Sequence, residues 1–204
     1  MKSPLGHVRV ATRSDWNVLT GMIREQYISL DDFEVHNPSC LMYDMSAVVL
    51  VAVLASGEIV SAMQGKMIGT VCELESATQC EIPRSSFKSP AVMITRAVTH
   101  SRYRRLGLSA LLYFHFVSMA IKQGGTMAIS TIYDSGPWVE HMKRLGFSLL
   151  TPSREWQSHV INKRPVLLAI LEQENLSRYV ALEGLSLETN LQSYPWSGDI
   201  PTLT

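Results

Sequence analysis

The chain has 204 residues, of which 46% are hydrophobic and 18% are charged. This composition excludes a disordered protein, and the length suits one folded domain or one domain with a tail. The formal net charge is zero, so no overall field favours nucleic acid or a membrane surface as the partner. Any electrostatic recognition must therefore be local.

The N-terminus and the apolar segments indicate neither export nor membrane insertion. The longest apolar run, residues 47–55, is far shorter than the roughly 20 residues that span a bilayer. The three cysteines, Cys40, Cys72 and Cys80, match no zinc or redox spacing. We therefore expect a cytoplasmic protein with reduced thiols and no metal, while a Cys72–Cys80 disulfide stays open as an alternative.

The first half of the chain predicts one helix and an antiparallel set of strands. Hydrophobic periodicity places a strand over residues 7–11, a helix over about 14–28, a strand over 46–54 and its hairpin partner over 59–68. Ser14 is the expected N-cap of the helix. Residues 29–45 lack a period and are interpreted as a loop, and residues 70–90 as an irregular connection.

The second half alternates strands with helices. The predicted elements are a strand over 91–98, a helix over 108–122, a strand over 126–133, a helix beginning near Pro137, and strands over 147–150 and 165–171. Together they indicate a mixed α/β domain over residues 1–172. Residues 173–204 are expected to form a C-terminal extension, either partly disordered or packed on the domain or on a partner, where they would support a homodimer.

The stretch SRYRRLGLSALL, residues 101–112, joins a predicted strand to a predicted helix. Backbone N–H groups in a first helical turn have no internal partner, and the helix dipole favours an anion there. Gly107 allows close approach of the backbone to a ligand, and Arg102, Arg104 and Arg105 add positive charge. The stretch therefore predicts a phosphate or pyrophosphate site, with a solvated basic turn as the alternative.

The pattern Arg104-x-x-Gly107-x-Ser109 resembles the Arg/Gln-x-x-Gly-x-Gly/Ala signature of the GNAT superfamily of N-acetyltransferases. The surrounding order resembles it too, because a strand precedes the motif and a helix, a strand and the segment SGPWVEHMKRLGF follow it. The resemblance covers about residues 7–172. It implies an α/β fold with a mixed central sheet of about six to seven strands, splayed between the fourth and fifth strands and flanked by helices.

The resemblance also implies a reaction. Family members bind acyl-coenzyme A in the splay, and a small-molecule or protein amine attacks the thioester directly, so the expected donor is acetyl-CoA or another acyl-CoA. A backbone N–H at Val98 would stabilise the oxyanion. The residues implied to bind the donor are Arg96, Ala97, Val98, Arg104, Arg105, Leu106, Gly107, Leu108 and Ser109.

The sequence departs from the family at the positions of the proton-transfer groups. The tyrosine that many members use to protonate the thiolate aligns with Met142, a common asparagine with Ser135, and an occasional strand carboxylate with Ser130. His141 could replace the tyrosine as the proton donor because imidazole titrates near neutral pH, but it points about 100° away from Met142 on the helix. Tyr133, at the end of the strand beside the splay, is the best-placed hydroxyl.

Two further interpretations stay open. The Tyr43-Asp44 pair and Thr95-Arg96-Ala97-Val98 resemble acyl-homoserine-lactone synthases and N-acyl amino acid synthases of the same superfamily. Such enzymes take the acyl chain from acyl carrier protein, an acidic partner that would suit four nearby arginines, Arg96, Arg102, Arg104 and Arg105. Alternatively, the missing tyrosine indicates a catalytically silent module that binds an acyl-CoA.

Overall fold

The structure of this chain is a computed structural model. It describes residues 6–28, 33–35, 43–44, 46–78, 82, 84–134, 137–151, 160–162, 166–191 and 196–197. Its main sheet contains the strands β1 (Gly6–Val10), β3 (Val48–Leu54), β4 (Ile59–Ile68), β5 (Ala91–Thr99), β6 (Met127–Tyr133), β7 (Ser148–Leu150), β9 (Val166–Glu172) and β10 (Trp196–Ser197). Two short strands, β2 (Phe33–Val35) and β8 (Val160–Asn162), form a separate antiparallel pair.

The main sheet has the order β10-β1-β3-β4-β5-β6-β9-β7. Its central neighbours β5 and β6 are parallel, while β1, β3, β4 and β5 form one antiparallel half and β6, β9 and β7 the other. The predicted mixed α/β sheet is therefore confirmed. It has one strand more than expected, because the two-residue β10 pairs in parallel with β1.

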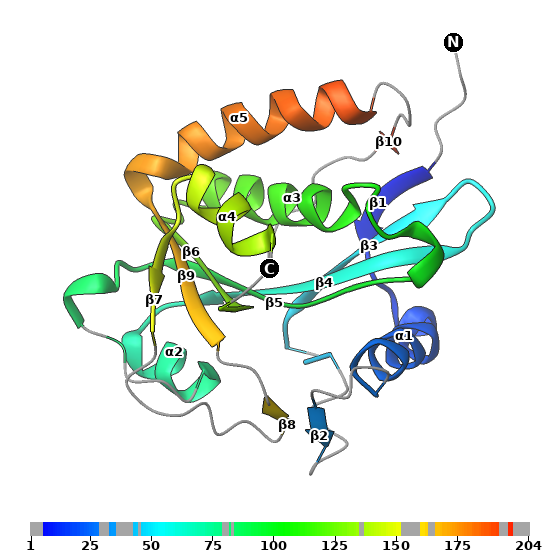
Figure 1. Ribbon diagram of the computed structural model, residues 1–204, viewed down its shortest axis with the longest axis horizontal. Coiled ribbons are helices and arrows are strands. Elements are labelled where there is room, and N and C mark those ends of the chain that lie inside the picture. The colour runs from blue at the N-terminus through cyan, green and yellow to red at the C-terminus, as the bar shows by residue number, and fades with distance from the viewer. Residues whose placement is uncertain are drawn as a thin grey trace.

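Five helices cover the two faces of this sheet (Figure 1). They are α1 (Trp16–Ile28), α2 (Val71–Thr78), α3 (Leu108–Lys122), α4 (Pro137–Arg144) and α5 (Gln173–Leu191). Figure 1 shows α3, α4 and α5 on one face and α1 and α2 on the other. The two faces bury separate apolar clusters, a large one under α3 and smaller ones against α1 and α2.

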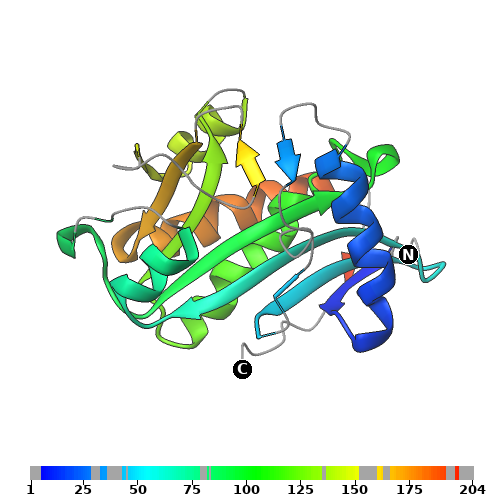
Figure 2. The ribbon, with the colours of Figure 1, turned by 90° about the horizontal axis from the view of Figure 1, so that it is seen from below.

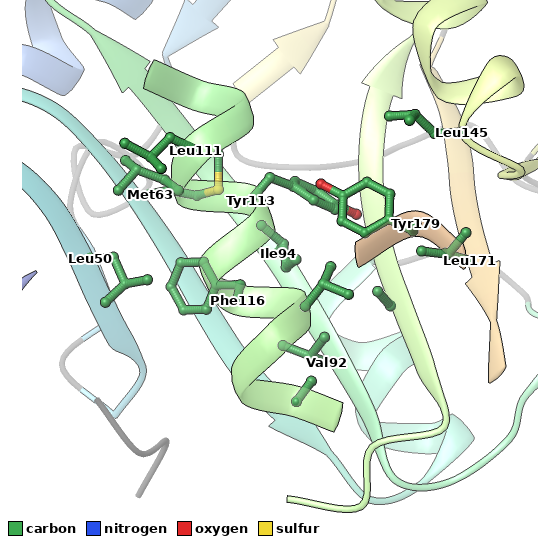
Figure 3. Close-up of a cluster of buried hydrophobic side chains, with 14 of the residues drawn as sticks. Leu50, Met63, Val92, Ile94, Leu111, Tyr113, Phe116, Leu145, Leu171 and Tyr179 are labelled. Carbon is green, nitrogen blue, oxygen red and sulfur yellow. The ribbon is translucent and has the colours of Figure 1, made fainter. Parts of the chain in front are cut away.

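The large cluster is built on α3, which is buried along most of its length. Figure 3 shows Phe116 directed from α3 toward the sheet, near Leu50 and Ile94. Its ring lies directly over Gly65 of β4, where a Cβ atom would overlap the ring. Burying apolar area on this scale is the main favourable term in folding, and here it fixes α3 across β4 and β5.

Three expectations about local structure need correction. Residues 71–78 of the expected irregular connection form α2, which begins with a capping box: Thr70 Oγ1 accepts from Glu73 N–H at 3.2 Å, and the Glu73 carboxylate accepts from Thr70 N–H at 3.2 Å. The expected loop over 29–45 contains β2. The turn that leads into α1 is capped by Thr12 and not by Ser14, because the Asp15 carboxylate accepts from Thr12 N–H at 2.6 Å.

The C-terminal helix α5 packs on α3 through Leu176 and Tyr179, which belong to the large cluster. No helix in the described part of the chain is long and apolar enough to cross a membrane. Cys72 is an exposed free thiol, so the alternative of a Cys72–Cys80 disulfide is wrong. Cys40 and Cys80 themselves lie outside the described residues.

Candidate active site

The two central strands separate partway along their length. β5 and β6 pair only from Ala91 opposite Met127 to Ile94 opposite Ser130. Beyond this point β5 continues to Thr99 and β6 to Tyr133 without pairing to each other, and Figure 2 shows the two ribbons diverging. The main sheet is therefore open between its fourth and fifth strands in chain order, as the family resemblance implied.

A β-bulge in β5 accounts for this separation. Ala62 of β4 lies opposite Val98, and Gln64 lies opposite Thr95, so β5 has one more residue than β4 between the two pairs. Arg96, inside the bulge, has φ of 50°, in the left-handed region that non-glycine residues rarely adopt. Because a bulge bends its strand and increases the local twist, β5 turns away from β6 just after their last pair.

The bulged edge of β5 is bound by side chains from the N-terminal half. The Tyr43 hydroxyl donates a hydrogen bond to the Arg96 carbonyl at 3.1 Å. The Gln26 carboxamide of α1 binds two backbone groups of β5: its Nε2 donates to the Ala97 carbonyl at 3.3 Å, and its Oε1 accepts from Thr99 N–H at 3.1 Å. These contacts hold the bulge from the side that β6 has left.

Asp44, next to Tyr43, lies in a polar cluster close to the bulge. Asp44 N–H donates to Gln64 Oε1 at 2.7 Å, and its carboxylate lies 3.7 Å from Lys66 Nζ. Burial favours the neutral carboxyl, but hydrogen bonds from Ser46 and the charges of Lys66 and Arg96 outweigh it and hold the pKa of Asp44 below its ordinary value. The Tyr43-Asp44 pair therefore supports β5 at the point where it bends.

The arginine-rich turn follows β5 directly. His100 Nδ1 accepts from Arg102 N–H, and Arg104 Nε donates to the Thr99 carbonyl, both at 3.4 Å. Arg105 has a left-handed φ of 67°. Among the described residues, no ion pair includes any of the four arginines that the sequence singled out, Arg96, Arg102, Arg104 and Arg105. Arg102, Arg104 and Arg105 are exposed, whereas Arg96 is half-buried and lies close enough to Asp44 to lower its pKa.

Gly107 forms the junction between this turn and α3. It has φ of 76°, and its carbonyl accepts from Leu111 N–H at 2.9 Å as the first bond of the helix. A Cβ atom there would meet nothing within 4 Å, so the position requires glycine for its dihedral angles and not for space. Glycine offers no capping side chain to the N–H groups of the first turn. The N–H groups of Leu108, Ser109 and Ala110 have no carbonyl partner inside the helix, because the first intrahelical donor is Leu111.

A chain of hydroxyl groups connects β4, β5 and this helix start. Ser61 donates to the Val98 carbonyl at 2.9 Å and shares a hydrogen bond of 2.9 Å with Thr99, which in turn shares one of 3.1 Å with Ser109. Ser109 stands where the signature that this stretch resembles has glycine or alanine, and its hydroxyl has a structural partner here. These hydrogen-bonded hydroxyl groups fix the start of α3 to the bulged segment of β5.

β6, on the other side of the opening, is regular. It pairs with β9 along its whole length, from Met127 opposite Glu172 to Tyr133 opposite Val166. Ser130 lies 3.4 Å from the Tyr113 hydroxyl, and burial raises the pKa of Tyr113 above its ordinary value. Tyr133, the predicted catalytic hydroxyl, is half-buried three residues beyond the last β5–β6 pair.

Neither the position of the missing tyrosine nor His141, its helical substitute, offers a ready proton donor. Met142 is 1% exposed and belongs to the large apolar cluster. His141 lies 3.9 Å from the buried Glu183 of α5 and stacks near Trp138, with ring centroids 5.0 Å apart. Burial lowers the pKa of His141, so the imidazole tends to be neutral. Ser135 lies outside the described residues.

The structure thus brings most of the predicted donor-binding residues onto one continuous segment. Arg96 and Ala97 form the bulge, Val98 follows it, and the residues from Arg104 to Ser109 form the turn and helix start. Tyr133 lies on the opposite strand. No three His, Cys, Asp or Glu side chains gather as a metal site in the part of the chain that is described. The edge of β5 and the start of α3 are therefore continuous along the chain.

Sequence reasoning missed Gln26, Ser61 and Thr99 as members of this site. Only Gln26 carried a signal: it lies three and four residues after Ile23 and Met22, so it extends the buried stripe of α1 with a polar group. A polar side chain in a buried stripe needs a partner, but its position, 71 residues away along the chain, cannot be deduced from local spacing.

The sequence matches no protein-family model and no curated protein. Solved structures do match. The N-acyl amino acid synthase FeeM from uncultured soil microbes superposes with a TM-score of 0.62 at 10% identity, over 88% of this chain and 99% of that chain. NAA60 from Arabidopsis thaliana, solved with acetyl-CoA, gives a TM-score of 0.58 at 13% identity, over 83% and 99% of the two chains.

A third match points to the same fold. The GCN5-related N-acetyltransferase from Kribbella flavida gives a TM-score of 0.56 at 15% identity, over 82% of this chain and 98% of that chain. At such low identity these similarities establish the fold and not an activity. The chain has the GNAT fold, and the fold prediction is confirmed.

Proposed function

We propose that this chain is an N-acyltransferase that moves an acyl group, most simply acetyl, from coenzyme A to a primary amine by direct attack. One observation carries the proposal: the strand edge opened by the β5 bulge leads directly into an arginine-rich turn and an uncapped helix start at Gly107. An acyl-CoA needs both features, because it joins a pyrophosphate to an arm of amide groups.

The donor would lie along this continuous segment. Its pyrophosphate would accept from the N–H groups between Arg104 and Ser109, where the helix dipole favours negative charge. Arg104 and Arg105 are exposed and would add charge-assisted hydrogen bonds. The pantetheine arm would follow β5 past Arg96 and Ala97, in place of the neighbouring strand that the sheet lacks there.

The oxyanion contact is proposed within the Val98–Thr99 peptide. His100 N–H donates to Val60 of β4 at 2.9 Å, so the alternation of a strand directs Thr99 N–H to the opposite, open side. The family resemblance implied the N–H of Val98, one residue earlier. An N–H group preorganised beside the thioester carbonyl would stabilise the tetrahedral intermediate as the amine attacks.

Proton transfer requires less of the protein than in enzymes with a tyrosine acid. The amine loses a proton on attack, and the thiolate gains one on departure. The Met142 side chain can neither accept the first proton nor donate the second. We propose that water carries the proton to the thiolate and that Tyr133, at the end of β6, is the side-chain hydroxyl closest to this route. The thioester bond breaks, the amide bond forms, and free CoA leaves as the thiol.

The test is a thiol-release assay with purified protein, acetyl-CoA and a panel of primary amines, combined with calorimetric titration of acetyl-CoA. We expect saturable binding and amine-dependent release of free thiol. Binding without release with any amine would favour the silent module, and the absence of binding by any acyl thioester would overturn the proposal.

A second candidate is an acyl-carrier-protein-dependent synthase of N-acyl amino acid type. The match to FeeM raises it as a candidate, and the four arginines without an ion-pair partner among the described residues would suit an acidic carrier protein. The same assay separates the two, with acetyl-CoA, a long-chain acyl-CoA and an acyl carrier protein as donors. Turnover with the carrier protein alone would select the second candidate.

A further inference from the structure

The contact between Gln26 and β5 occupies the two backbone groups that a thioester donor would use. Gln26 Oε1 accepts from Thr99 N–H at 3.1 Å, and its Nε2 donates to the Ala97 carbonyl at 3.3 Å. Both backbone groups lie beyond Ile94, where β6 stops pairing with β5. A single planar carboxamide therefore satisfies one donor and one acceptor on the open edge, as a neighbouring strand would.

The chemistry of an acyl-pantetheine arm matches these two groups. Its thioester carbonyl is an acceptor for Thr99 N–H, and an amide N–H farther along the arm is a donor for the Ala97 carbonyl. The neighbouring Arg96 carbonyl already accepts from the Tyr43 hydroxyl at 3.1 Å. The donor and the Gln26 side chain would thus compete for the same pair of hydrogen bonds.

The position of Gln26 makes an exchange feasible. Its side chain is half-buried, unlike Met22 and Ile23, which anchor the same helix in the apolar cluster against β3 and β4. α1 can therefore keep its packing while the carboxamide swings away about its own side-chain bonds. A half-buried carboxamide that leaves the edge has water to bind.

We propose that Gln26 is a specificity-determining residue that covers the open edge of β5 until an acyl-pantetheine donor replaces its two hydrogen bonds. Donors that replace both bonds displace it at little net cost, whereas a ligand that reaches only the turn at Gly107 leaves it in place. This inference rests on the proposed function, because it requires a thioester donor that runs along β5.

The test compares two ligands in the wild-type protein and in Gln26→Ala. Acetyl-CoA contains the arm and the thioester, whereas adenosine 3′,5′-bisphosphate contains only the phosphate-bearing end. Removing the competing side chain should tighten acetyl-CoA binding about fivefold, the equivalent of one net hydrogen bond, and leave the bisphosphate Kd unchanged. Calorimetry gives both constants.

Two further variants control this experiment. Glu25→Ala changes an exposed neighbour on the same helix and should bind both ligands as the wild-type protein does. Gln26→Met keeps the length of the side chain without its hydrogen bonds, and it replaces Gln26→Ala if that variant fails to fold. Circular dichroism and thermal unfolding establish that each variant is folded.

The outcomes are distinguishable. Tighter acetyl-CoA binding with unchanged bisphosphate binding supports the inference. Unchanged or weaker acetyl-CoA binding in both folded Gln26 variants overturns it and leaves the proposed function standing, because Gln26 would then position the donor or take no part. If the wild-type protein binds neither ligand, the proposed function fails and the inference fails with it.

Discussion

The two sides of the opening differ in how they are built. The β5 wall, consisting of β5, the turn that follows it and the start of α3, has a bulge, left-handed residues and an edge held by side chains. The β6 wall, consisting of β6, β9 and α4, is a regular strand paired along its length and covered by buried apolar groups. The sheet opens because one strand bends and not because both do.

Because the two walls differ in this way, we expect ligand binding to depend mainly on the β5 wall and folding stability mainly on the β6 wall. In the proposed function the β5 wall presents backbone groups and positive charge to a ligand, whereas the β6 wall buries Met142 of α4 in the core. We therefore expect substitutions in the β5 wall to change donor affinity more than folding. Substitutions of the buried apolar side chains of the β6 wall, such as Met142, should change folding first, and activity only through it.

The largest expected effect is the loss of donor binding on Gly107→Asp in the β5 wall. The new carboxylate would stand at the helix start and repel the pyrophosphate, so we expect acetyl-CoA affinity to fall by at least about a hundredfold. Calorimetry measures this loss.

Gly124→Asp is the matched control for Gly107→Asp. Gly124 follows the other end of α3 with φ of 77°, and a Cβ atom there also meets nothing within 4 Å. It should carry the same backbone strain, about 1–2 kcal/mol, without any effect on binding. Equal affinities in the two variants would show that the phosphate site lies elsewhere.

In the β6 wall, Met142→Ala should cost about 2–5 kcal/mol in the free energy of unfolding, because it leaves a cavity in a fully buried site. Met142→Leu conserves the volume and should cost less than about 1.5 kcal/mol. Urea unfolding measures both. If the folded Met142→Leu variant lost its thiol-release activity, Met142 would have a role in the reaction and the division between the two walls would be wrong.

Acid should weaken the attachment of α1, the helix that carries Gln26 to the β5 wall. The Arg9 guanidinium donates to both Asp15 carboxylate oxygens, at 2.7 and 3.0 Å, and with Thr12 it outweighs burial and lowers the pKa of Asp15. The folded state then binds the proton less readily than the unfolded state, so this stabilisation is complete above the unfolded pKa of about 3.9 and is lost as pH falls below it.

Asp15→Asn measures that contribution. We expect it to destabilise the protein by about 1–3 kcal/mol at pH 6, where the wild-type carboxylate is charged. The difference between variant and wild type should shrink as the pH falls through about 4 and below. Urea unfolding across this range gives the curve, and a difference that is independent of pH would contradict the assignment.

The sequence alone indicated a candidate phosphate-binding segment because that segment depends on local order, whereas the opening of the sheet was implied by the family resemblance. The strand, the arginines, Gly107 and the helix follow one another within 32 residues, from position 91 to position 122. The helix α2 could have been predicted as well, since Thr70 and Glu73 have the spacing of a capping box. Here the signal was present and was interpreted as an irregular connection.

The groups that hold the β5 edge could not be predicted in this way. Gln26 and Tyr43 bind backbone atoms of residues 71 and 53 positions away, and the register that brings them together is set by the packing of α1 on the sheet. The bulge itself depends on one extra residue between two strand pairs. Neither the bonds to the backbone nor the bulge leaves a pattern in the residue types, because backbone carbonyl and N–H groups are the same at every position.

The smallest predicted effect tests the two strands directly. Arg96 is left-handed, so Arg96→Gly should be more stable than Arg96→Ala by about 0.5–1 kcal/mol. Thr131, in the regular β6, lies opposite Leu168, and there Thr131→Gly should be less stable than Thr131→Ala by a similar amount. Urea unfolding of the four variants gives the two differences, which should have opposite signs. The same sign at both positions would mean that the strain in β5 does not survive in solution, and that the bend which opens the sheet needs another cause.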